Sequence, residues 1–286
     1  MTVASGAQPG PQARRTPAVE KAEPAPATAA RRPRRFGLPA ALVPVASVAA
    51  LLLVWQVVSA TFFPPVLFPT PVMVGKAFAA EIASGRLLRD SLVSLRRIFA
   101  GFALGCAIGA SLGLLMGSVR LARRALDPFI QFGRFVPSIS LLSPALIWFG
   151  IGEGSKLFLI TYTTTFIVLL NTLGAVLTVP RNKIRAAQSL GATRWQLFRL
   201  VMLPASLHGI FTGMRVGMGL SFTTVVAAEM IAADTGLGFL IINSRLWFQT
   251  DVVFVGIITL GVLGYLADKA FQALIHRLAG RYAPTH

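Results

Sequence analysis

The chain has 286 residues, of which 55% are apolar and only 13% are charged, and its mean hydropathy is +0.70. This composition is too apolar for an ordinary soluble domain, so the sequence predicts an integral membrane protein. The net charge of +17 would fit a nucleic-acid-binding protein, but the basic residues concentrate in the segments between apolar runs. Such a distribution indicates membrane topology, and we expect no nucleic-acid partner.

The first 36 residues are rich in Ala, Pro and Arg and show no apolar period. A segment of this kind cannot bury a core, so we predict a disordered basic tail over residues 1–36 and a transmembrane domain over residues 37–286. The apolar run that begins at Leu38 is longer than the core of an ordinary signal peptide. We interpret it as the first membrane span.

A helix needs about 20 residues to cross a hydrocarbon core about 30 Å thick. Windows of that length and apolarity occur at residues 40–62, 98–118, 127–149, 155–178, 210–232 and 252–273. Pro137 and Pro144 predict that the third span is kinked or partly broken. The more basic connecting segments fall on one side if both termini are cytoplasmic. Residues 76–97 carry basic side chains on the opposite side, and we interpret them as an amphipathic helix at the outer interface.

Two spans carry glycines spaced about four residues apart, which places them on one helical face. In a bilayer, such faces allow helix backbones to approach closely. The glycines predicted to pack helices in this way are Gly101, Gly105, Gly109, Gly113, Gly117, Gly209, Gly213 and Gly217.

Polar side chains inside spans are candidates for a translocation path, because a charge at the bilayer centre costs at least about 2.5 kcal/mol. Hydroxyl groups in spans more often bond their own backbone or a neighbouring helix, so packing remains the alternative for each of them. The candidate path residues are Thr161, Thr164, Thr165, Asn171, Ser221 and Thr224.

A polar segment interrupts the apolar pattern between the fourth and fifth spans. Pro180 suits a first helical turn, and Gly191 suits a helix end. Thr193 and Gln196 have the spacing of a capping box, which starts a second helix that we expect to end at Pro204. The sequence therefore predicts two short helices around a glycine, within a loop over residues 179–209.

This loop resembles the "EAA" coupling loop of the membrane subunits of ATP-binding cassette importers. The matching residues are Ala186, Ala187, Gly191, Leu203 and Pro204, whereas Arg185 stands where the family usually has Glu. The resemblance implies that the loop docks on a cytoplasmic ATPase, with Thr193 and Arg194 opening the second helix. Trp195 and Phe198 would anchor it in the ATPase groove, although Trp195 packing against its own helix ends is an alternative.

The resemblance extends over nearly all of residues 64–275 and is to the permease group that serves aliphatic sulfonates, taurine, nitrate, related small anions or thiamine precursors. It is carried by segments such as LIWFGIGEGSK and VVAAEMIAADTGLGFLI. It implies an all-α MetI-like fold, a homodimer in the bacterial inner membrane, and an external solute-binding protein. ATP and Mg²⁺ would be used by the ATPase subunits and no cofactor would be bound by this chain.

The residues also exclude some chemistry. The phosphate-binding loop of ATPases, G-x-x-x-x-G-K-[ST], does not occur in the sequence. At the nearest candidate, Gly75-Lys76, Thr70 stands in place of the first glycine and Ala77 in place of the final Ser or Thr. The lone Cys106 and the separated histidines predict no disulfide, metal site or catalytic residue. An ATP-independent secondary transporter or channel is an alternative, but the spans contain no clear acidic pair in mid-membrane. An intramembrane enzyme is disfavoured because no nucleophile and base are paired by the sequence.

Overall fold

The computed structural model describes residue 2 and residues 42–279, so the predicted tail over residues 1–36 lies, except for Thr2, outside the described residues. The chain divides into two units, Met1–Ser47 and Val48–His286. The described part of the first unit is Thr2 and the start of helix α1, Leu42–Phe62. The second unit contains the other helices.

In the second unit the helices follow one another with short connections, and the described residues contain no strand. The helices after α1 are α2 (Pro71–Ala83), α3 (Arg86–Ser118), α4 (Arg120–Gly133), the 3₁₀ turn η1 (Ser138–Leu141), α5 (Leu142–Phe149), α6 (Glu153–Leu177), α7 (Arg181–Ser189), α8 (Arg194–Leu197), the π-helical segment η2 (Phe198–Met202), α9 (Leu203–Ala232), α10 (Leu237–Leu246) and α11 (Thr250–Ala279).

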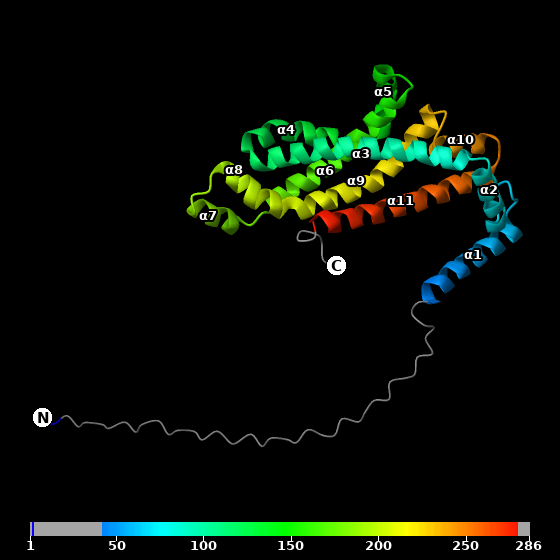
Figure 1. Ribbon diagram of the computed structural model, residues 1–286, viewed down its shortest axis with the longest axis horizontal. Helices are drawn as coiled ribbons and strands as arrows, with labels where there is room; N and C mark the ends of the chain where they lie inside the picture. The colour runs from blue at the N-terminus through cyan, green and yellow to red at the C-terminus, as the bar shows by residue number, and fades with distance from the viewer. Residues whose placement is uncertain (1, 3–41, 280–286) are drawn as a thin grey trace. The chain divides into compact units, whose positions relative to one another are not determined.

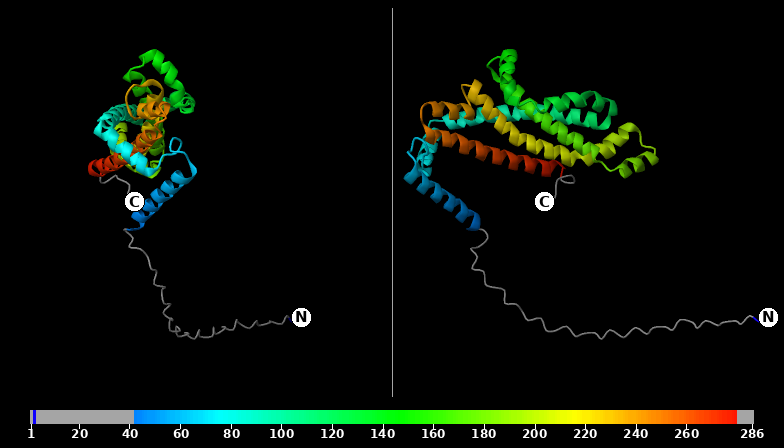
Figure 2. Two further views of the ribbon diagram at one scale, coloured as in Figure 1. Left: turned by 90° about the vertical axis from the view of Figure 1, so that its right-hand side faces the viewer. Right: turned by 180° about the vertical axis from the view of Figure 1, so that it is seen from behind.

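Five of the described helices are long and apolar enough to cross a membrane, and a bent pair makes up to six. The bent pair is α4 with η1 and α5, which meet at 90°. Pro137 lies at the start of η1, so the expected break in the third span is present at that proline. Figure 2 shows α5 turned out of the direction of α4. The all-helical fold predicted from the sequence is confirmed.

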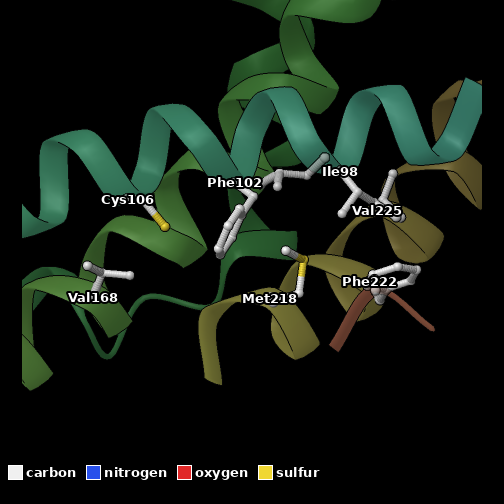
Figure 3. Packing of buried hydrophobic residues seen from close by; sticks show 9 residues of the cluster. Ile98, Phe102, Cys106, Val168, Met218, Phe222 and Val225 are labelled. Carbon is white, nitrogen blue, oxygen red and sulfur yellow. The ribbon is translucent and has the colours of Figure 1, made fainter. Parts of the chain in front are cut away.

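The core of the second unit is formed by α3, α6 and α9, which run side by side (Figure 1). All three contribute to one buried apolar cluster, in which Phe102 and Cys106 of α3 face Val168 of α6 and Met218 of α9 (Figure 3). Helix α11 completes this cluster through Ala267. The three central spans therefore pack around one shared apolar interior.

The glycine face of α3 lies directly against α6. A Cβ atom added at Gly105 would stand 2.5 Å from the Cβ of Thr164, and one added at Gly113 would stand 2.6 Å from the Cβ of Thr172. Helix α9 approaches α6 in the same way, since a Cβ at Gly213 would lie 2.5 Å from the Cβ of Asn171. The absence of a side chain at these positions sets the distance between the helices.

One expectation for the outer side is wrong. Residues 76–97 do not form a single amphipathic helix at the interface, because α2 ends at Ala83 and α3 already begins at Arg86. Gly85, with φ 72°, makes the corner between them. Helix α3 continues without a break into the membrane span, and it carries Arg97 into the interior, where only 3% of that residue is exposed.

Candidate functional site

The loop over residues 179–209 has the helix-turn-helix form that the sequence indicates, and α7 and α8 lie beyond the ends of α6 and α9 (Figure 1). Gly191 follows α7 with φ 79°, a backbone conformation that residues other than glycine rarely adopt. The capping box at α8 is complete: the Gln196 backbone N–H donates to Thr193 Oγ1 at 3.3 Å, and the Thr193 N–H donates to Gln196 Oε1 at 2.8 Å. The conformation of the turn between α7 and α8 therefore follows from residues within the turn itself, namely Gly191 and the Thr193–Gln196 capping box.

The second helix does not end at Pro204, contrary to expectation. Helix α8 passes through the π-helical segment η2 directly into α9, in which Pro204 occupies the first turn. A proline inside an α-helix has no N–H to donate to the carbonyl one turn earlier, and its ring clashes with that carbonyl. The wider π turn just before the proline relieves that conflict, so α8, η2 and α9 form one continuous helix over Arg194–Ala232.

The loop exposes large apolar side chains together with basic ones. Trp195 is 64% exposed and stacks on Phe198, with ring centroids 5.6 Å apart and an interplanar angle of 27°. Leu190 and Leu200 are 89% and 69% exposed. Of the other residues predicted for this site, Ala187, Leu203 and Pro204 are half-buried, whereas Arg185, Ala186, Gly191, Thr193 and Arg194 are exposed. The Trp195–Phe198 pair is thus available to a partner.

The candidate path residues lie at the contacts between the central helices. Thr161 donates to the Gly101 carbonyl at 3.3 Å, and Thr165 to the Gly105 carbonyl at 3.5 Å. The hydroxyls of Thr164 and Ser221 are bonded to each other at 2.9 Å in the buried interior. In this geometry these four side chains join helices, and a role in translocation stays a prediction.

The two remaining path candidates also bond within the bundle. Thr224 donates to the carbonyl of Leu220 on its own helix at 3.0 Å and lies 3.2 Å from the hydroxyl of Thr163. Asn171 donates from Nδ2 to the carbonyl of Ile167 at 2.9 Å. Bonds to the residue four positions earlier are usual for short polar side chains in a span.

A buried ion cluster at the opposite end of α3, α6 and α9 was not predicted. Arg97 on α3 donates from Nη1 to Glu229 Oε1 on α9 at 2.8 Å, and from Nε to Glu153 Oε2 at the start of α6 at 2.8 Å. The same guanidinium bonds the carbonyl and the hydroxyl of Thr235. Glu229 is fully buried, whereas 45% of the Glu153 side chain is exposed. One arginine thus ties three helices together.

The segment after α9 closes over the buried carboxylate. The Gly238 N–H donates to Glu229 Oε2 at 2.9 Å, and Ser94 bonds the same carboxylate at 2.8 Å. Ser94 in turn accepts the N–H of Leu237, and Asp90 accepts that of Gly236. Each oxygen of Glu229 therefore has a donor, which is the condition under which a buried charge is tolerated.

A second ion pair borders a cavity of about 510 Å³ between α9 and α11. Arg215 donates to both oxygens of Asp268, at 2.7 and 3.0 Å, and Gln272 bonds the same carboxylate. His208, Thr212 and His276 complete the polar lining. Within the part of the chain that the structure describes, no group of three His, Cys, Asp or Glu residues is placed to hold a metal ion.

Comparisons with known proteins identify the family of the chain. The family model described as "Binding-protein-dependent transport system inner membrane component" matches residues 105–280. The taurine transport system permease protein TauC of Escherichia coli K12 is 37% identical over 240 residues, covering 82% of this chain and 87% of TauC. The putative aliphatic sulfonates transport permease protein SsuC of the same strain is 38% identical over 237 residues, covering 82% of this chain and 90% of SsuC.

Among solved structures, an inward-facing form of the MetNI methionine ABC transporter superposes with a TM-score of 0.60. The alignment covers 69% of this chain and 98% of that one at 21% identity. Similarity at this level of identity shows that the two chains share a fold.

Proposed function

The chain belongs to the family of binding-protein-dependent transport system inner membrane components, and we propose that its loop over residues 179–209 is the surface on which a cytoplasmic ATPase subunit docks. The protein is a permease subunit of an ATP-binding cassette importer, a multi-pass inner membrane protein without an ATPase site of its own. Permeases of this family work with an ATPase and a solute-binding protein. The observation that carries the docking proposal is the capped helix-turn-helix with its exposed Trp195.

Two of the central helices are directly connected to this loop. Helix α7 begins four residues after the end of α6, and α8 continues through η2 into α9. Helices α6 and α9 are themselves in close contact along Gly209 and Gly213. A displacement of the loop by the ATPase would therefore move α6 and α9 together, which is the rigid-body motion that alternating access requires.

The assembly that we propose is a homodimer of this chain with two ATPase subunits, which bind ATP and Mg²⁺, and an external binding protein that delivers the solute. Both termini would be cytoplasmic, because that orientation places the basic loop and the basic tail inside. ATP binding would bring the two docking loops together and open the dimer outward, and hydrolysis would reset it.

The solute that we propose is a small sulfonate such as taurine, or a related small anion such as nitrate. Support comes from the relatives that are named for taurine and aliphatic sulfonates. The positive charge of the chain carries no weight here, since it follows from topology. Uptake of labelled taurine, alkanesulfonates and nitrate by proteoliposomes that contain the whole assembly tests the proposal, and transport of a thiamine precursor in their place would overturn it.

Docking is tested by purification of the tagged chain from native membranes in mild detergent. We expect a phosphate-loop ATPase at one copy per copy of this chain, identified by mass spectrometry, and a dimeric permease. Recovery of this chain alone, with transport in vesicles that contain no ATP, would contradict the proposal.

Gly191 provides a sharper test of the loop. A φ of 79° is strained for most residues other than glycine, and above all for β-branched ones, whereas no atom lies within 4 Å of an added Cβ. The effect of a substitution therefore comes from the backbone alone. We expect Gly191→Val to reorient α7 relative to α8, at a cost of about 1–3 kcal/mol, and to uncouple ATP hydrolysis from uptake. Gly191→Asn is the matched control, because asparagine tolerates this conformation. Equal coupling ratios in the two variants would count against the docking role.

A further inference from the structure

We propose that the docking loop is recognised by charge, and that the cognate ATPase presents carboxylates to α7, with Arg185 as the residue that selects this ATPase over others. This inference rests on the proposed docking function.

Every charged residue of the loop is basic. The sequence contains no Asp or Glu between Glu153 and Glu229, and the basic residues of the loop within that interval are Arg181, Lys183, Arg185, Arg194 and Arg199. None of these five forms an ion pair with another described residue. The positive charge of the loop is therefore not neutralised by the described part of its own chain.

The arrangement on α7 is unfavourable for an isolated helix. Arg181 and Lys183 lie in its first turn, which has no acidic residue, although the positive end of the helix dipole disfavours cations there. Arg181 and Arg185 are four positions apart, where like charges on one helical face repel each other. The positive-inside rule explains why a cytoplasmic loop carries basic residues, but not why they cluster on one short helix. A partner that brings negative charge to α7 accounts for this clustering of basic residues.

The polarity of α7 favours a protein partner over the membrane surface. A helix that lies in a bilayer interface buries a face of large apolar side chains. Ile184, Ala186 and Ala187 are the only apolar residues of α7, and they cannot supply such a face. By contrast, the exposed Trp195 with basic residues around it matches a protein interface, in which aromatic and arginine residues are enriched and the rim is polar.

Arg185 is the position at which charge gives selectivity. It is exposed on α7, and the coupling loop that this segment resembles has Glu at this place. A surface that complements Glu offers positive or hydrogen-donating groups, which would repel Arg185. The positive charge of Arg185 therefore favours binding to an ATPase with an acidic groove and disfavours binding to an ATPase whose groove fits a loop with Glu at this position.

The experiment measures the affinity of the purified permease for its cognate ATPase in phosphatidylcholine nanodiscs at increasing NaCl concentration. We expect Arg185→Glu to weaken assembly at least about tenfold at low salt, in line with measured couplings of close interfacial charge pairs, and Arg185→Lys to stay within about threefold. Arg124→Glu is the matched control, since Arg124 is an exposed arginine on α4 and lies outside the loop, and this variant should bind as the unchanged chain does. The difference between Arg185→Glu and the unchanged chain should shrink as salt rises.

Equal affinity of Arg185→Glu and the unchanged chain at low salt would overturn the inference while leaving docking intact. It would also be overturned if Arg124→Glu fell as far as Arg185→Glu, or if the loss appeared only in phosphatidylglycerol nanodiscs, which would indicate a membrane contact. Restoration of binding to Arg185→Glu by a carboxylate-to-arginine change in the ATPase groove would support it directly, even if the single variant were poorly folded. Failure of the unchanged chain to bind any ATPase would instead reject the docking function itself.

Discussion

Arg97→Met is expected to destabilise the protein by about 3–5 kcal/mol, the range for breaking a buried ion pair by removal of one partner. The reason is the environment of Glu229. This carboxylate is fully buried, and without Arg97 it would retain only Ser94 and the Gly238 N–H as donors. Glu153 would lose its partner too, but its half-exposed side chain can reach water. The midpoint of thermal unfolding in detergent, followed by loss of the monodisperse peak in size-exclusion chromatography, measures the effect.

A second change should reverse part of this loss. In Arg97→Met/Glu229→Gln the buried group is neutral, and its amide oxygen can still accept from Ser94 and from the Gly238 N–H. The double variant is therefore expected to be more stable than Arg97→Met alone. Arg96→Met is the control, because the neighbouring arginine is exposed and should change stability by less than about 0.5 kcal/mol. A double variant less stable than Arg97→Met would show that charge burial does not dominate at this cluster.

The contrast between Arg97 and Gly191 shows why part of this protein could be predicted and part could not. The turn at Gly191 and the capping box at Thr193 depend on residues within a few positions of each other, so their spacing in the sequence determines them. The partners of Arg97 lie 56 and 132 positions away, at Glu153 and Glu229. No local rule brings residues so far apart in the sequence together. From the sequence alone, a basic residue at the edge of an apolar span fits the outer interface as well as it fits a buried ion pair.

The same distinction separates the spans from their contacts. Apolar windows of about 20 residues identified the helices because a bilayer sets their length. Arg215 and Asp268, however, pair across 53 positions between α9 and α11, and each was visible in the sequence only as an isolated charge. At Pro204 a local rule was overridden, because the preceding π turn removed the conflict that would have ended the helix.

Gly105→Leu is expected to separate α3 from α6 and to abolish folding of the central bundle or cost at least about 1–3 kcal/mol. An added Cβ would stand 2.5 Å from the Cβ of Thr164 and 2.9 Å from the Thr161 carbonyl oxygen. The second contact is with backbone, so no change of rotamer relieves it. Separation of the helices would also break the bonds from Thr161 to Gly101 and from Thr165 to Gly105. The yield of monodisperse protein and its thermal midpoint in detergent measure the effect.

Gly174→Leu on α6 is the matched control, because it introduces the same side chain into a membrane-spanning helix at a position with no neighbouring atom within 4 Å of an added Cβ. We expect Gly174→Leu to leave yield and stability close to those of the unchanged chain. Equal behaviour of the two variants would contradict close packing at Gly105 as the source of the effect. A partly folded Gly105→Leu protein should also lose coupling between ATP hydrolysis and uptake. Helix α7 is connected to α6 by a short segment, so the loop moves with α6, but in this variant α6 would no longer be packed against α3 and would not move it.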